Sequence, residues 1–154
     1  MQTFLPYKSF ENSVKSLDYR RLGKQRVEAK QILNVLLDRT ETKGWRNHPI
    51  TKMWVGYENA LKEYYNTCVK EWINQGYNNT MELEEIEGDI KYPKWLGNDL
   101  LHSSHRANLL RKDQEYYSKF MWNENPDDPY AWYDTDKNQW YLQLVGTGVR
   151  EYVI

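Results

Sequence analysis

The sequence has one cysteine, no long apolar run and almost no net charge. The single Cys68 excludes a disulfide within the chain and is typical of a protein from a reducing compartment. No apolar stretch approaches the length of a membrane span, and the first residues do not resemble a signal peptide. We therefore expect a cytoplasmic protein that does not bind membranes. A formal net charge of −1 gives it no overall field that would attract a polyanion.

The sequence also lacks repeats and the glycine-rich loops that cradle nucleotide phosphates, so neither a P-loop nor a GxGxxG motif is present. A metal site would need the three histidines, His48, His102 and His105. No cysteine or carboxylate falls at ligand spacing beside them, and the neighbouring arginines would repel a cation. We predict no metal and no other cofactor.

Aromatic residues and segregated charge are abundant instead. The aromatic share is 15%, with 7 Trp and 13 Tyr, and such rings can fill a core or stack on bases. Residues 8–30 hold seven basic and three acidic side chains, whereas residues 82–89 and 124–136 each hold five acidic ones and no basic one. The near-neutral total therefore conceals one basic and two acidic regions, and the local field decides what each can contact.

The hydrophobic pattern predicts a mostly α-helical protein, a compact bundle of three long helices with a small C-terminal β-hairpin. One domain is expected over 1–154, with a helical core at about 1–122 and an aromatic extension at about 123–154. The long helices are expected at 18–39, 49–75 and 99–112, with Asp18, Asn47 or His48, and Asn98 as the capping residues. The other expected elements are an ordered arm at 1–7, short helices at 10–17 and 116–121, an acidic surface loop at 78–93 with at most one helical turn, the hairpin at 130–142 and a further strand within 146–154.

The first candidate site is the start of the helix expected at 18–39. Helical spacing places Arg20, Lys24 and Glu28 along one face, with Arg21 and Gln25 beside them. A solvated basic face with a Lys24–Glu28 ion pair is the structural explanation of this pattern. A strip that binds phosphate and offers a carboxylate for chemistry is the functional one. Gly23 indicates a kink or the close approach of another group.

Two further polar segments are expected at helix starts or on exposed faces. The loop before Pro49 contains Trp45, Arg46, Asn47 and His48, and the helix expected at 99–112 shows His102, His105, Arg106 and Asn108 on the face opposite its leucines. Helix capping and surface polarity would explain both segments. Together with the basic strip, they favour a phosphodiester partner.

Four stretches also resemble a known family: Met1–Pro6 (MQTFLP), Arg21–Ala29 (RLGKQRVEA), Gly44–Pro49 (GWRNHP) and His102–Lys112 (HSSHRANLLRK). They are similar to pyrimidine-dimer DNA glycosylases of the phage endonuclease V type, in a divergent bacterial and viral branch, and the similarity covers about residues 1–122. The resemblance implies a compact helical protein that binds damaged duplex DNA. In that family the α-amine of an N-terminal threonine attacks the sugar carbon, a Schiff base forms, a glutamate assists β-elimination, and neighbouring arginines hold phosphates.

The resemblance carries over only in part. Asp18–Leu22 aligns with the segment that contains the family's glutamate, so Arg20 takes a phosphate-binding position and Arg21 falls at the catalytic one. Thr3 is not the second residue, and Gln2 is too bulky for ordinary removal of the methionine. Glu28 is the nearest carboxylate on the same face, and Met1 or Lys24 would have to supply the amine.

These observations lead to the hypothesis of an N-glycosylase that excises a damaged or modified base from DNA, with or without lyase activity. Three outcomes stay open: an amine nucleophile with Glu28 as acid and base, a water activated by Glu28, or binding without chemistry. A hydrolase of free nucleotides or nucleosides is a further class. The partner is DNA or a nucleotide, and no protein partner is inferred. The catalytic candidates are Glu28, Lys24 and Arg21, and the substrate-binding candidates are Arg20, Arg26, Trp45 (as the ring that stacks on a base), Arg46, Asn47, His48, His102, His105, Arg106, Asn108 and Lys112.

Overall fold

Helices dominate the architecture, as the hydrophobic pattern predicts. The computed structural model describes residues 1–41 and 44–153. Within them no helix is both long enough and apolar enough to cross a membrane. The elements are α1 (Phe10–Ser16), α2 (Tyr19–Leu36), α3 (Pro49–Met53), α4 (Glu58–Asn74), α5 (Asp99–Lys112), α6 (Gln114–Tyr117), a 3-10 turn (Ser118–Phe120), β1 (Tyr130–Asp134), β2 (Gln139–Gln143) and β3 (Arg150–Tyr152).

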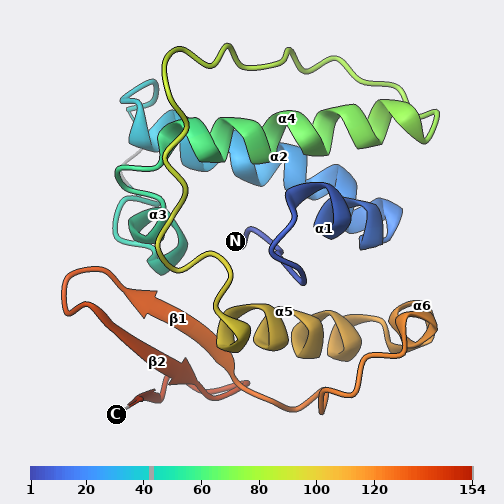
Figure 1. The fold of residues 1–154 in the computed structure, drawn as a ribbon, viewed down its shortest axis with the longest axis vertical. Helices are drawn as coiled ribbons and strands as arrows, with labels where there is room; N and C mark the ends of the chain where they lie inside the picture. The colour runs from blue at the N-terminus through green and yellow to red at the C-terminus, as the bar shows by residue number, and fades with distance from the viewer. Residues whose placement is uncertain (42–43, 154) are drawn as a thin grey trace.

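The elements form two layers with the N-terminal arm between them. In Figure 1, α2 and α4 lie side by side above, α5 and the sheet lie below, and the N-terminus sits in the middle. The predicted hairpin is confirmed as β1 and β2, and the tail adds β3, so that the antiparallel order is β1-β2-β3. The sheet packs on α5 and α3 through β1. This arrangement places the arm against both layers.

Capping follows the sequence in most places. The Ser9 hydroxyl accepts from the N–H of Asn12 at the start of α1, and the Asn98 side chain accepts from the N–H of Leu100 at the start of α5. His48, rather than Asn47, caps α3, because its Nδ1 accepts from the N–H of Ile50. Asp18 precedes α2 without a capping bond from its side chain. Its carboxylate instead accepts from Tyr117 and Arg21.

The long helix expected at 49–75 is wrong in one respect, because the chain breaks it in two. After α3 the backbone turns at residues 54–57, with Gly56 at a φ of +87°, and α4 starts anew at Glu58. The break turns Trp54 fully into the core, where its indole N–H donates to Thr3 Oγ1 at 3.1 Å. The apolar residues on both sides of 54–57 keep helical spacing, so periodicity alone does not reveal the break. The break coincides with the burial of Trp54. α2 also ends earlier than expected, at Leu36, and Asp38 follows at a positive φ of 53°.

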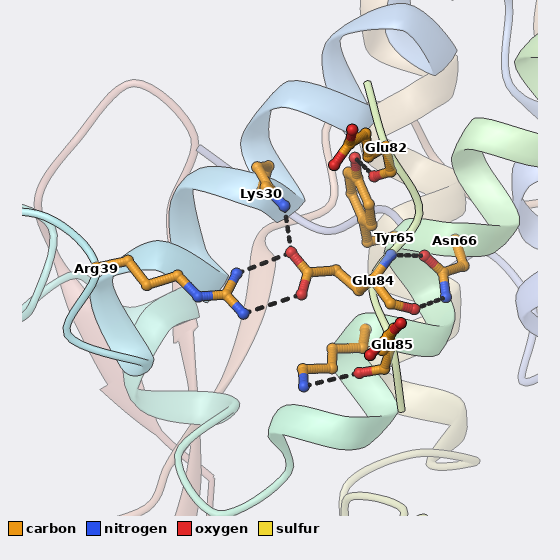
Figure 2. A network of polar contacts seen from close by, with 8 residues as sticks. Lys30, Arg39, Tyr65, Asn66, Glu82, Glu84 and Glu85 are labelled. Carbon is orange, nitrogen blue, oxygen red and sulfur yellow. Dashed lines mark hydrogen bonds and ion pairs between the residues drawn. The ribbon is translucent and has the colours of Figure 1, made fainter. Parts of the chain in front are cut away.

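The acidic segment 78–91, here called the acidic strap, runs extended along α4 without the helical turn that the sequence allowed. Side chains about two turns apart on α4 hold its backbone: Asn59 donates to the carbonyls of Glu87 and Asp89, and Asn66 pairs with both the N–H and the C=O of Glu84. The Glu84 carboxylate turns the other way, to a bidentate pair with Arg39 and a bond from Lys30 (Figure 2). The strap therefore ties α4 to α2.

Candidate functional site

A cleft of about 980 Å³ opens between the basic strip of α2 and the C-terminal sheet. The N-terminal arm contributes to its lining, and the end of α5 lies at its edge. We call it the α2–sheet cleft. Its lining residues are Met1, Gln2, Phe4, Asp18, Tyr19, Arg20, Arg21, Lys24, Gln25, Glu28, His48, Lys112, Asp113, Tyr116, Tyr130, Trp132 and residues 143–147.

The cations of this cleft are incompletely neutralised. Neither the Lys24 nor the Lys112 ammonium makes a hydrogen bond or ion pair with any residue in the described ranges, and Arg20 contacts only the Tyr19 hydroxyl, at 3.4 Å. Arg21 pairs with Asp18 at 3.0 Å. The pKa of Lys112 is lowered by partial burial and by the nearby charges of Arg21, Arg111 and Lys24. Arg20, Lys24 and Lys112, which make no ion pair with a carboxylate in the described ranges, are therefore suited to bind an anion.

Glu28 is held at the arm instead of pairing with Lys24. Its Oε2 accepts from the backbone N–H of Gln2 at 3.1 Å and from the Gln25 amide at 3.4 Å. Gln25 is buried and also fixes the arm, because it donates to Gln2 O and accepts from the Phe4 N–H, both at 2.8 Å. The carboxylate is thus fixed in position beside the first residues of the chain, while half-exposed to the cleft.

Two histidines of α5 hold the arm from the other layer. His102 Nδ1 donates to Leu5 O at 2.7 Å, because its Nε2 accepts from the N–H of Gly97. His105 Nδ1 accepts from the N–H of Leu5 at 2.9 Å. Burial, more than the neighbouring His102, lowers the pKa of His105 to about 3, so this ring is neutral near pH 7. The pair clamps one residue of the arm by both of its backbone groups.

The expected exposure of the polar face of α5 is therefore wrong. His102, His105 and Asn108 are buried, and Arg106 lies between Glu124 at 3.1 Å and Pro6 O at 2.8 Å. The face is polar because it contacts backbone groups of the arm and the chain after α6, which need hydrogen-bond partners in the interior. Of the four residues, none lines the α2–sheet cleft. The described residues contain no group of three or more histidine, cysteine or carboxylate side chains placed to hold a metal ion.

Of the 44–49 loop, only His48 reaches the cleft. Burial, followed by the charge of the N-terminus, lowers its pKa, which indicates that the α-amine lies close by. Trp45 is 40% exposed beside the His48 ring and outside the cleft lining. Arg46 pairs with Asp38, and Asn47 is exposed. The loop brings one of its four candidate residues to the cleft.

Arg26 and Gly23 lie against Trp72 of α4. The Arg26 guanidinium lies 4.2 Å from the centre of the Trp72 ring and donates to Asn79 at 2.8 Å. Gly23 lies within the continuous helix α2 and does not interrupt it. A Cβ there would lie 3.0 Å from the same Trp72 ring, so the glycine makes room for it. Both residues attach α4 and the start of the acidic strap to α2.

Reasoning from sequence missed the opposite wall of the cleft. The alternation of residues in 130–143 does not show which face of the strands meets α2. Gln2 and Gln25, which hold the arm, were missed as well, because they carry no charge. The structure places Tyr130 and Trp132 on the opposite wall, with rings stacked at 5.7 Å, together with Gln143 and the turn at 144–147. The alternation at 130 and 132 was the only available signal. The cleft thus has a cationic wall and an aromatic wall, with a fixed carboxylate at the arm.

A comparison with protein families gives one match. The family model described as pyrimidine dimer DNA glycosylase matches residues 1–85, which include the arm, α2 and the 44–49 loop. The match ends before α5 and the sheet. No curated protein and no solved structure matches the chain.

Proposed function

From the premise that this chain belongs to the pyrimidine dimer DNA glycosylase family, a family whose substrate is DNA, we propose that it excises a damaged or modified base within the α2–sheet cleft. The observation that carries the proposal is the position of Glu28. This carboxylate is fixed 3.1 Å from the backbone nitrogen of Gln2, in a cleft where Arg20, Lys24 and Lys112 make no ion pair with a carboxylate of the described residues. The arrangement joins an acid–base group to a phosphate-binding surface.

In this proposal, Glu28 takes the role of the glutamate whose aligned position holds Arg21. Residue 28 lies about two helical turns beyond residue 21, yet the arm lies alongside α2 and meets the later residue. Arg21 is paired with Asp18 and always charged, so it suits phosphate binding rather than proton transfer. Arg20, Lys24 and Lys112 hold the phosphates on either side of the excised nucleotide.

Two kinds of nucleophile, water and an amine, fit the cleft. In the water route, Glu28 accepts a proton from water, the oxygen bonds to C1′, and the electron pair of the glycosidic bond leaves with the base, which is protonated. In the amine route, the nitrogen of Met1 or Lys24 bonds to C1′ and the base leaves in the same way. The ring then opens to an imine, Glu28 removes a C2′ proton, and the 3′ phosphate departs.

Borohydride trapping on duplexes that carry pyrimidine dimers or modified bases separates these routes. A covalent protein–DNA adduct, mapped by peptide mass spectrometry, identifies the amine route and its nitrogen. Release of the base without an adduct supports the water route. The catalytic proposal fails if no base is released from any such duplex, or if Glu28→Gln releases base as fast as the wild type.

A second candidate is hydrolysis of a free nucleotide. The volume of the cleft suits a single small ligand, and the net charge of −1 suits a mononucleotide better than a long polyanion. Competition decides between the candidates. Mononucleotides at micromolar concentration should not displace a lesion-containing duplex if DNA is the substrate.

A further inference from the structure

The wall of the cleft opposite α2 comes from the C-terminal sheet, which the family model does not match. Tyr130 and Trp132 are two residues apart on β1 and therefore share one face of the strand. Their cross-strand partners on β2 are Gln143 and Tyr141, which continue this face. Of this face, Tyr130, Trp132 and Gln143 line the cleft together with the turn at residues 144–147 and with Arg20, Lys24 and Glu28 of α2.

The polar group of this wall has a fixed orientation. The Trp132 indole N–H donates to Gln143 Oε1 at 3.0 Å, so the oxygen of this amide points toward Trp132. The NH₂ end makes no hydrogen bond with any residue in the described ranges. Gln143 therefore offers a donor at the cleft, beside the half-exposed Tyr130 ring and the exposed side chains of Leu144 and Val145.

We propose that this sheet face receives the base of the nucleotide whose phosphates α2 holds, with Tyr130 as the ring that contacts the base and Gln143 as the donor to its edge. The inference rests on the proposed function and specifies its substrate as an unpaired nucleotide, extruded from DNA into the cleft. The chemistry of the two walls supports this occupant. A nucleotide is anionic at one end and flat, aromatic and rich in acceptors at the other, and the cleft has the complementary surface at each end.

Trp132 supports the platform rather than forming it. It is 6% exposed, and it contacts the His48 ring at 6.0 Å and Tyr130 at 5.7 Å. Arg111 lies 5.5 Å from the centre of the Tyr130 ring, and its guanidinium also donates to Pro126 O. Tyr130 is therefore held in place before a ligand arrives, and little side-chain freedom is lost on binding.

The test compares two duplexes that differ by one base. The first carries an unpaired thymine, and the second carries a tetrahydrofuran abasic analogue at the same position. Fluorescence anisotropy gives the dissociation constant of each, and their ratio isolates the base. We expect the wild type to bind the thymine duplex more tightly, and Tyr130→Ala to reduce this preference about tenfold without weakening the abasic complex.

Gln143→Glu is the second variant. It keeps an oxygen for Trp132 but replaces the donor with a second oxygen, so the preference for the base should be lost while the melting temperature is unchanged. The added negative charge weakens both complexes and cancels in the ratio. Tyr92→Ala removes a tyrosine that is 49% exposed and lies outside the cleft, and should change neither complex.

The outcomes separate this inference from the proposed function. Equal binding of both duplexes by the wild type, or an unchanged ratio in both variants, overturns the base-receiving wall and leaves phosphate binding intact. Mononucleotides that bind as tightly as the thymine duplex also overturn it, because the occupant would then be free. If no base is released but the variants change the ratio of the two dissociation constants as expected, the glycosylase proposal fails and the base-receiving role of the sheet face is supported.

Discussion

The two ends of α2 carry basic side chains in opposite states. Near its C-terminal end, Lys30 and the following Arg39 converge on Glu84, whose side chain is 6% exposed (Figure 2). Near its N-terminal end, Arg20 and Lys24 face the cleft without any carboxylate partner in the described part of the chain. Basic side chains at one end of the helix thus form ion pairs within the protein, and those at the other end are unpaired and can bind an anion.

The difference shows how to separate structural from functional charge. A cation paired with a shielded carboxylate stabilises the fold and offers little to a ligand. A cation whose pKa is lowered by burial and by neighbouring positive charges, as that of Lys112 is, is costly for the free protein, and an anion that binds beside it offsets this cost. Substitutions at the two ends should therefore change different measurements.

The largest expected effect is that of Glu28→Gln. The amide keeps an acceptor for the N–H of Gln2 but cannot take a proton, so base release should fall about 100-fold or more. The free energy of unfolding should change by less than about 1 kcal/mol, because the residue is half-exposed. Single-turnover assays and urea unfolding measure the two quantities. Loss of folding without loss of activity per folded molecule would place Glu28 among the structural charges.

Glu84→Gln is the matched change at the other end and should affect stability alone. The Arg39 hydrogen bonds, with a smaller contribution from Lys30, lower the pKa of Glu84 to about 2. A lowered pKa means that this stabilisation is present above the unfolded pKa of 4.5 and is lost as the pH falls towards 2. The variant should lose about 3 kcal/mol at pH 7 and show a flatter decline between pH 5 and pH 2.

Urea unfolding at several pH values gives that comparison, with Glu28→Gln as the control. Base release by Glu84→Gln, measured below its melting temperature, should match the wild type. If the free energy of unfolding falls equally with pH in Glu84→Gln and in the wild type, Glu84 is not a principal source of acid sensitivity.

The basic residues give a smaller effect. Arg20→Ala should weaken DNA binding about tenfold at low salt and lower the slope of log K against log salt concentration by about 0.9. Lys30→Ala should leave the slope unchanged and lower the melting temperature. Anisotropy titrations from 50 to 200 mM salt measure the slope on a non-specific duplex. Identical slopes for the two variants would remove the distinction between the ends of α2.

The smallest expected change is that of Trp45→Ala. Sequence reasoning makes Trp45 the stacking ring, but it lies outside the cleft lining, so affinity for a base-bearing duplex should change less than about twofold. The same titration on Tyr130→Ala is the positive control. A larger loss for Trp45→Ala than for Tyr130→Ala would restore the original assignment.

The helices were accessible from the sequence because their signals are local. Periodic leucines and the cap Asn98 predict α5 closely, and the short helix expected at 10–17 is found as α1. The break at Gly56 was not accessible from the sequence, because the burial of Trp54 involves a hydrogen bond to Thr3, about fifty residues away. Mostly helical architecture with a C-terminal hairpin is therefore confirmed, whereas one of the expected long helices is two.

The candidate site was likewise predictable only where its signals are local. Arg20, Lys24 and Glu28 share a helix face, so their common presence in the cleft follows from spacing alone. The histidines of α5 were expected on the surface, because a polar residue on a helix usually faces water. Their burial depends on a strandless arm that needs hydrogen-bond partners, which no local pattern reveals.

The clamp on Leu5 also sets an order of assembly. The backbone of Leu5 bonds to His105, 100 residues later, and to His102, so this residue gains its partners only when α5 exists. Gln2 and Phe4 can bond earlier, because their partners Glu28 and Gln25 belong to α2. The arm is therefore fixed in two steps, and the wall of the cleft at 130–147 is added last during synthesis. A nascent or truncated chain that ends before α5 would carry the basic helix without the opposite wall of the cleft.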